Sequence, residues 1–162
     1  MLPEEVKKFI GKVVSTSTLE VEKGAIQRFA EAVDDPNPLY RDEEYAMSSR
    51  YGSIIAPPGF FGWPAKGKSQ GVVFSLLEGE LEQALTKAGY NTTSAIDGGI
   101  TYEFFQAIRA GDSLTASLSI KDIAERKGPA GKALFIIYET TYTNQNGNLV
   151  VKERGTFIHP GS

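Results

Sequence analysis

Few side chains in this 162-residue sequence are suited to acid–base or covalent chemistry. There is no cysteine, which excludes a thiolate nucleophile, a disulfide and a zinc–thiolate site. The single histidine, His159, would have to serve any Ser-His-Asp triad or multi-histidine metal site without a second imidazole. We therefore expect no metal and no cofactor, and we expect His159 to lie on the surface.

The most informative stretch runs from Phe29 to Glu44 and contains Asp-Asp-Pro-Asn-Pro-Leu-Tyr, which ends at Tyr40. Taken alone, a cluster of Asp, Asn and Pro is typical of a turn. Tyr40 is either a packed ring whose hydroxyl is tied to a neighbour or a phenol that takes part in chemistry. We favour packing, because a phenol with a pKa of about 10 donates a hydrogen bond at neutral pH but is a poor base.

Composition indicates one globular domain over residues 1–162, since 41% of residues are hydrophobic and 23% are charged. The formal charge of -3 is too small to favour nucleic acid as a partner. No stretch approaches the roughly 20 apolar residues of a membrane span, and the first five residues are acidic where a secretory signal would be basic. We expect a cytoplasmic protein that does not bind membranes.

The first half of the sequence predicts a strand followed by helices. Residues 10–21 mix β-branched and polar side chains, as strands do. A helix is expected from Lys23 to before Asp34, and Asp42 is expected to cap a second helix that ends near Ser49. The apolar stripe of the first helix is Ile26, Phe29, Ala30 and Val33.

Two prolines interrupt the apolar segment at residues 54–59, which predicts a buried turn followed by helices over 60–66 and 72–88. Aromatic residues at that helix start could line an acyl pocket, although filling the core is the commoner role. Lysines just beyond could contact a CoA or phosphopantetheine phosphate, but we favour a solvated face. These residues are Phe60, Phe61, Trp63, Lys66 and Lys68.

The second half predicts long antiparallel strands over 113–120, 133–143 and 149–158. Asn144–Gly147 is a strong hairpin signal between the last two of them. Helices in the first half of the sequence and a meander of antiparallel strands in the second half favour an α+β architecture. We expect one sheet with its helices on one face. Open sheet edges are often closed by pairing across a twofold axis, so we expect a dimer.

The stretch up to Glu44 resembles the signature of the MaoC-like dehydratase and (R)-specific enoyl-thioester hydratase family, a helix followed by Asp-x-Asn-Pro-Leu-His. Asp35, Asn37, Pro38 and Leu39 match that signature, and Tyr40 stands where the family has histidine. Segments 51–61, 104–115 and 141–147 also resemble the N-terminal MaoC-like dehydratase type. The resemblance implies a hotdog fold, an antiparallel sheet wrapped around a central helix.

The same resemblance implies site residues. By position, Asp35, Asn37 and Tyr40 would form the catalytic group, and the thioester would bind beside the start of the hotdog helix. Family hydratases place His-Gly there with a backbone N–H facing the thioester oxygen, whereas prolines stand here and lack that N–H. Gly59 or the next residue would have to donate instead. The implied substrate-binding residues are Pro57, Pro58, Gly59, Phe60 and Phe61.

Hydration of a double bond conjugated to a thioester needs a base for water, an acid for the α-carbon and donors to the thioester oxygen. With Tyr40 in place of histidine, Asp35 would act alone, and loss of one acid–base group costs roughly 10² to 10⁴-fold in rate. The leading hypothesis is therefore a subunit that binds an acyl-CoA or acyl-carrier-protein thioester and pairs with a histidine-bearing hotdog chain. The alternatives are an active homodimeric hydratase that uses Asp35 and a non-catalytic acyl-CoA-binding module. A thioesterase is a weaker alternative, because hotdog folds host that activity too.

Overall fold

The computed structural model describes residues 2–64, 79–93, 95–128 and 131–161. Six strands form one antiparallel sheet, and most of them are long. The strand predicted over 113–120 continues to residue 128, which makes it the longest of the sheet. The strands are β1 (Val13–Glu20), β2 (Trp63–Pro64), β3 (Ile96–Phe104), β4 (Ser113–Gly128), β5 (Gly131–Thr143) and β6 (Leu149–Pro160).

The sheet has the order β2-β1-β4-β5-β6-β3. Consecutive strands β4, β5 and β6 form its centre as a meander, and β5 and β6 are joined by the predicted turn at Asn144–Gly147. The Asn144 side chain closes that turn by accepting hydrogen bonds from the backbone N–H groups of Asn146 and Asn148. The α+β class and the hotdog sheet are thus confirmed.

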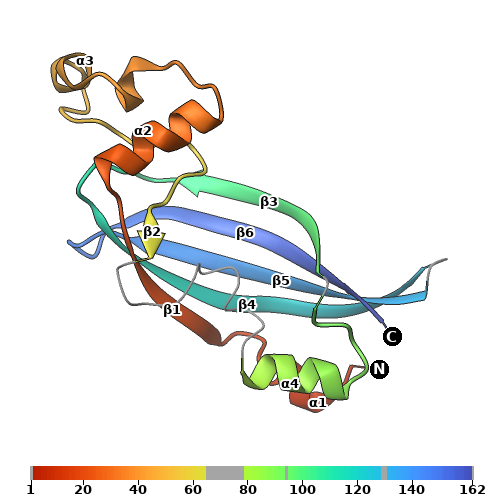
Figure 1. The fold of residues 1–162 in the computed structure, drawn as a ribbon. Coiled ribbons are helices and arrows are strands. Elements are labelled where there is room, and N and C mark those ends of the chain that lie inside the picture. Colours follow the sequence, from red (N-terminus) through yellow and green to blue (C-terminus); the bar gives the residue numbers. More distant parts are fainter. Residues whose placement is uncertain (1, 65–78, 94, 129–130, 162) are drawn as a thin grey trace.

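Short helices lie at the two ends of the sheet (Figure 1). Those at one end are α2 (Lys23–Ala32) and α3 (Glu43–Ser48), and those at the other are α1 (Glu4–Lys7) and α4 (Glu80–Lys87). Asp42 caps α3 as predicted, because its carboxylate accepts from the N–H of Tyr45 at 3.0 Å. The prediction that Val33 belongs to the apolar stripe of this helix is wrong, because Val33 follows the last turn of α2 and is exposed.

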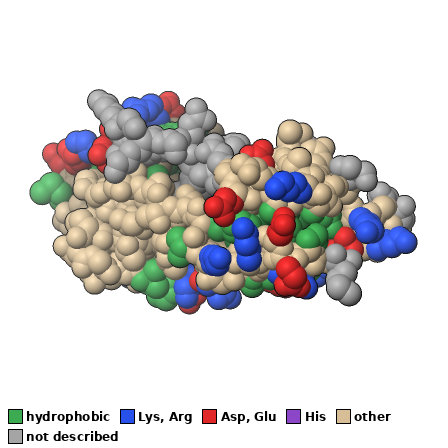
Figure 2. All heavy atoms as spheres, turned by 90° about the horizontal axis from the view of Figure 1, so that it is seen from below, with side chains coloured by type: hydrophobic (Ala, Val, Ile, Leu, Met, Phe, Trp, Pro, Cys, Tyr) green, Lys and Arg blue, Asp and Glu red, His purple; other side chains and the backbone are tan. Residues whose placement is uncertain are grey.

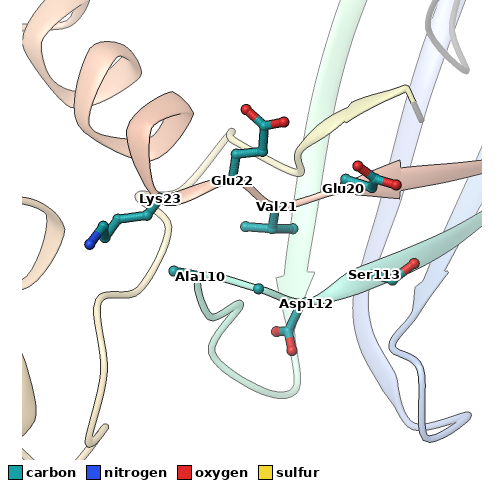
Figure 3. A pocket seen from close by; sticks show the side chains of 8 residues that line it. Glu20, Val21, Glu22, Lys23, Ala110, Asp112 and Ser113 are labelled. Carbon is teal, nitrogen blue, oxygen red and sulfur yellow. The ribbon is translucent and has the colours of Figure 1, made fainter. Parts of the chain in front are cut away.

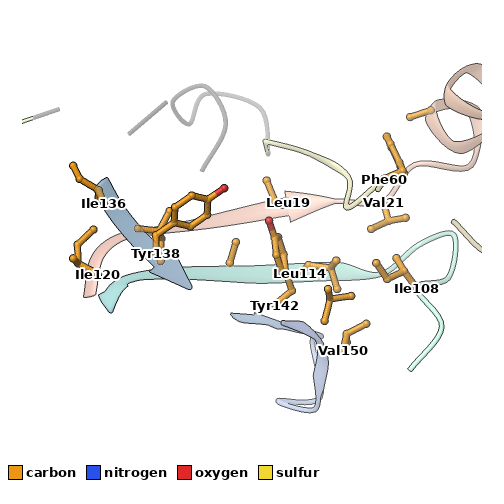
Figure 4. Close-up of a cluster of buried hydrophobic side chains, with 14 of the residues drawn as sticks. Leu19, Val21, Phe60, Ile108, Leu114, Ile120, Ile136, Tyr138, Tyr142 and Val150 are labelled. Carbon is orange, nitrogen blue, oxygen red and sulfur yellow. The ribbon is translucent and has the colours of Figure 1, made fainter. Parts of the chain in front are cut away.

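The core lies against the inner face of the sheet. Alternation along β4 points four apolar side chains inward, and all four are fully buried, as the pattern predicts. Side chains of β1, β5 and β6 cover the same face, and Figure 4 shows several of them rising between the strands. The four buried residues of β4 are Leu114, Ala116, Leu118 and Ile120.

The segment after the two prolines differs from the prediction. Trp63 and Pro64 form β2 and pair with Glu20 and Leu19, so the helix predicted from Phe60 to Lys66 does not begin in the described part. Gly62 makes this pairing possible, because a Cβ there would lie 2.7 Å from the carbonyl oxygen of Glu20. Of the helix predicted over 72–88, α4 is the described part; Lys66, Lys68 and residues 72–78 lie outside the described residues.

Candidate functional site

The Asp-Pro-Asn-Pro turn is held by its own side chains. The Asp35 carboxylate accepts from the N–H of Asn37 at 3.0 Å, and the Asn37 side chain accepts from the N–H of Leu39 at 3.1 Å. The second bond caps a short 3-10 helix, Pro38–Tyr40. Asp34 adopts a positive φ of 53°, which lets the chain turn sharply after α2. The turn therefore presents Tyr40 in a fixed position.

Tyr40 is buried, with 8% of its surface exposed. Burial and the negative charge of Asp35 raise the pKa of its phenol, and the Asn37 side chain opposes that shift only in part. The phenol is thus neutral at physiological pH and can donate a hydrogen bond, and even less of it is ionised there than of an ordinary tyrosine. The structure brings Asp35, Asn37 and Tyr40 together as the resemblance implies.

The proline segment docks against this turn through backbone hydrogen bonds. The N–H of Ile55 donates to the carbonyl of Leu39 at 3.2 Å, and the N–H of Ala56 donates to the carbonyl of Ile108 at 2.9 Å. These bonds tie the proline segment both to the turn at Leu39 and to the loop at Ile108, which are far apart in the sequence. Residues 54–56, which precede the two prolines, and the loop after β3 therefore belong to the same site as Tyr40.

A pocket of about 440 Å³ lies at this junction. Tyr40, Arg50, Tyr51 and Pro58 contribute to one wall, and residues 104–108 form the other. Asp35 does not line this pocket. Of the implied substrate-binding residues, only Pro58 lines the pocket; Pro57, Gly59, Phe60 and Phe61 do not.

The two phenylalanines differ in role. Phe60 is buried and packs on Phe29 at 5.3 Å and Trp63 at 6.3 Å between ring centroids, so it fills the core. Phe61 is half-buried and sits between the pocket-lining Phe104, at 6.4 Å, and Tyr142 of the inner sheet face, at 4.7 Å. Phe61 therefore links the pocket-lining Phe104 to the core.

Arg50 was not identified from the sequence. Its guanidinium lies 4.8 Å from the centre of the Tyr51 ring and donates to the Tyr51 hydroxyl at 2.6 Å. It places one positive charge on the pocket wall. No sequence signal separates it from other exposed arginines, because only the fold brings residue 50 beside residues 104–108.

The prediction for His159 was wrong. The side chain is fully buried, and its Nδ1 lies 3.0 Å from the carbonyl oxygen of Asn91. Strand alternation explains this, because His159 pairs with buried Leu134 in β5. Burial lowers the pKa of His159, so the imidazole is neutral at pH 7.

A second hollow, of about 610 Å³, lies where β1 meets α2 (Figure 3). Glu20, Glu22 and Asp112 line it, and the one lysine there, Lys23, is paired with Glu43. Within the described ranges no group of three or more His, Cys, Asp or Glu side chains is arranged to hold a metal ion. This hollow has no arrangement that indicates chemistry.

The face seen in Figure 2 carries acidic and basic side chains interspersed over the sheet and its neighbours. This pattern agrees with the small net charge of the sequence. Among the helices described, none has the length and apolar character needed to cross a membrane.

Comparison with known proteins identifies the family. Residues 8–153 match the model of the FAS1-like dehydratase domain region. The chain belongs to the FAS1-like dehydratase family. A UPF0336 protein of Streptomyces avermitilis is 33% identical over 123 residues, which cover 74% of each chain. A probable enoyl-CoA hydratase alpha subunit of Thermomonospora curvata is 29% identical over 134 residues, 80% of this chain but 41% of that protein.

Solved structures show that this FAS1-like dehydratase has a MaoC-like hotdog fold. A chain of the ChsH1-ChsH2 complex from Mycobacterium tuberculosis superposes with a TM-score of 0.77 at 18% identity, covering 98% of this chain and 92% of that one. The MaoC-like dehydratase from Rhodospirillum rubrum superposes with a TM-score of 0.59 at 18% identity, covering 93% and 94%. The family match includes the Asp35 turn and the pocket wall at 104–108.

Proposed function

We propose that this FAS1-like dehydratase is the acyl-thioester-binding subunit of an (R)-specific 3-hydroxyacyl dehydratase or enoyl-CoA hydratase, and that a second hotdog chain in the cytoplasm supplies its catalytic histidine. One observation carries the proposal. The pocket holds a neutral phenol at residue 40, and the chain's single histidine is buried at the far end of β6.

The distance between the pocket and His159 follows from the register of β3 and β6. Phe104 lines the pocket and pairs with Val151, and His159 is eight residues further along β6. At about 3.4 Å per residue, roughly 27 Å separates the two positions along the strand. A general base must lie within hydrogen-bond reach of its proton, so His159 cannot serve this pocket within the same chain.

The remaining groups suit binding better than proton transfer. Hydration adds the water oxygen to the β-carbon and a proton to the α-carbon of an enoyl thioester. The Tyr40 hydroxyl can donate a hydrogen bond to an oxygen of the substrate, and Arg50 can attract the phosphates of CoA or phosphopantetheine. Apolar side chains give the acyl group a wall; they are those of Ile55, Phe104, Phe105, Ala107 and Ile108.

The exposed edge of the sheet supports a hotdog partner. Strand β3 pairs only with β6 in the described structure, and all nine of its residues are exposed. Several are large and apolar, and an apolar strand edge is a template for pairing with another chain. The similar proteins named as an alpha subunit and as part of the ChsH1-ChsH2 complex agree with a partnered role. The exposed apolar residues are Ile96, Ile100, Tyr102 and Phe104.

Co-expression tests the proposal. The chain is purified together with the histidine-bearing hotdog protein encoded nearest to it, and hydration of crotonyl-CoA and longer 2-enoyl-CoA substrates is measured. We expect a stable complex whose rate exceeds the sum of the two separate chains. Replacing the partner's motif histidine with alanine should abolish that rate, whereas Tyr40→Phe should lower it modestly. A complex that is no faster than the partner alone would refute the proposal, and an active single chain would select the homodimeric alternative.

A further inference from the structure

A group of polar side chains is buried on the inner face of the sheet, away from the Asp35 turn. Glu153 is 3% exposed, Tyr138 is 1% exposed, and Thr140 is fully buried. Thr140 and Glu153 stand directly opposite each other on β5 and β6, with Tyr138 and Tyr142 on the same face to either side of Thr140. Figure 4 shows the rings of Tyr138 and Tyr142 rising from that face.

Within the described residues, one side-chain hydrogen bond of ordinary length and angle joins this group. The Tyr142 hydroxyl donates to one carboxyl oxygen of Glu153 at 2.9 Å. The other carboxyl oxygen, the Tyr138 hydroxyl and the Thr140 hydroxyl have no hydrogen-bond partner within the described structure, although Tyr138 faces the same carboxyl. A buried polar atom without a partner destabilises a fold, so three together call for an explanation.

The surroundings raise the pKa of the Glu153 carboxyl. Burial is the largest cause, the hydroxyls of Tyr142 and Tyr138 oppose the shift, and the negative charge of Asp97 adds to it. Burial also raises the pKa of Tyr138 and of Tyr142, so both phenols are neutral. The group therefore offers neutral hydroxyl donors beside a carboxyl that accepts hydrogen bonds.

The pocket and this polar group are neighbours along the sheet. Phe104 lines the pocket, and Tyr102, which pairs with Glu153, stands two residues away on β3, roughly 7 Å at about 3.4 Å per residue. Phe61 bridges them, since its ring centre lies 5.2 Å from that of Tyr102 and 4.7 Å from that of Tyr142. An acyl chain that enters past Tyr40 and displaces Phe61 would reach the unpartnered oxygens.

The position of Tyr138 is fixed by its neighbours. Its ring packs on Phe157 at 5.0 Å between centroids with an interplanar angle of 16°. It also occupies the space beside Gly155, where a Cβ would lie 2.3 Å from the ring and hydroxyl atoms. The hydroxyl is thus held in place without a partner, as in a preorganised binding site.

We infer that Tyr138, Thr140 and Glu153 form the polar end of the acyl site and select an acyl group that carries a hydroxyl several carbons from the thioester. A hydroxyl both donates and accepts, so it can accept from the phenol and the threonine hydroxyl and donate to the carboxyl. A plain alkyl chain would leave those atoms unpaired, and sites that contain such atoms discriminate against it. This inference rests on the proposed thioester-binding function.

Calorimetric titration of the full chain tests this inference about the acyl site. The probes are hexanoyl-, octanoyl- and decanoyl-CoA, each compared with its ω-hydroxy counterpart. We expect the hydroxylated member to bind about tenfold more tightly at one of these lengths. Tyr138→Phe should reduce that ratio to near one while raising the melting temperature, because it removes an unpaired buried hydroxyl. Tyr90→Phe is the control, since its hydroxyl is bonded to Glu125 elsewhere and its loss should leave the ratio unchanged.

The outcomes separate the two proposals. Equal affinity for both members of every pair would overturn the polar acyl site and leave the thioester-binding function standing. Survival of the preference in both Tyr138→Phe and Glu153→Leu would also overturn it, because a purely structural group would change stability but not the ratio. If the chain binds no CoA thioester at all, both proposals fail.

Discussion

Tyr40 and His159 lie at opposite ends of the sheet, although the resemblance to MaoC-like hydratases implies an imidazole where the phenol stands. Tyr40 shares its pocket with Phe104, which pairs with the start of β6, and His159 lies near the end of that strand. The imidazole is buried against the carbonyl oxygen of Asn91. The pocket at Tyr40 and the chain's histidine are therefore not in one place.

Restoring the family residue tests the role of position 40. Tyr40→His should raise hydration of crotonyl-CoA by the purified chain, by up to about 10²-fold, because it places an imidazole beside Asp35. Steady-state assays of the wild type, Tyr40→His and Tyr40→Phe measure this. Tyr40→Phe is the matched control and should stay as slow as the wild type. No gain in a folded Tyr40→His variant would mean that the pocket lacks other groups that hydration requires.

The β3 edge gives a prediction about assembly. Ile100→Lys introduces a charge on an exposed apolar strand that we propose as the partner interface, and it should convert the complex into separate chains. Light scattering after gel filtration measures the mass. Met47→Lys is the control, because Met47 is also apolar and is even more exposed than Ile100 but lies on α3. An unchanged mass for Ile100→Lys would move the interface elsewhere.

His159 should make stability depend on pH. Its pKa is lower in the folded chain than its ordinary value of 6.5, so the unfolded chain binds a proton first as the pH falls. The contribution of His159 to the free energy of unfolding is therefore constant above pH of about 6.5 and declines as the pH falls from there through the folded pKa. Urea unfolding of the wild type and His159→Gln between pH 7 and 5 measures this difference. Parallel curves for the two proteins would contradict it.

Ionisation of Glu153 should lower the free energy of unfolding as the pH rises, the opposite of the effect of His159. Its pKa is raised above its ordinary value of 4.5, so ionisation favours the unfolded chain once the pH exceeds that value. Glu153→Gln cannot ionise, so its stability relative to the wild type should increase as the pH rises from 4.5 through the folded pKa. The same unfolding experiment measures it, with the exposed Glu103→Gln as control. A wild type that gains on Glu153→Gln with rising pH would show that the pKa of the carboxyl is lowered in the fold, which would contradict this account.

Local patterns in the sequence predicted most of the sheet. Alternation along Leu114 to Ile120 predicted the buried face of β4, and Asn144–Gly147 predicted the hairpin between β5 and β6, because both depend on neighbouring residues. The capped helix at Asp42 is a third such case. The resemblance also implied that Asp35, Asn37 and Tyr40 lie together, which the hydrogen bonds from backbone N–H groups to the Asp35 and Asn37 side chains explain.

Features that depend on distant pairings were missed. Strand β3 contains two glycines and aspartate, so it does not read as a strand, and only pairing with β6 orders it. The burial of His159 follows from its register with Leu134, which the sequence near the histidine does not reveal. Trp63 and Pro64 join the sheet because Gly62 lets the chain approach Glu20 closely. Arg50 reaches the pocket wall through the same kind of long-range contact.

The rate at which the purified chain alone hydrates crotonyl-CoA tests the central claim most directly. Tyr40 is a protonated phenol, and the histidine lies roughly 27 Å along β6 from Val151, the partner of the pocket-lining Phe104. The lone chain should therefore be slower than its complex with a histidine-bearing hotdog chain by about 10² to 10⁴-fold. A lone chain as fast as the complex, with the rate lost in Asp35→Asn, would contradict the account and assign catalysis to this chain.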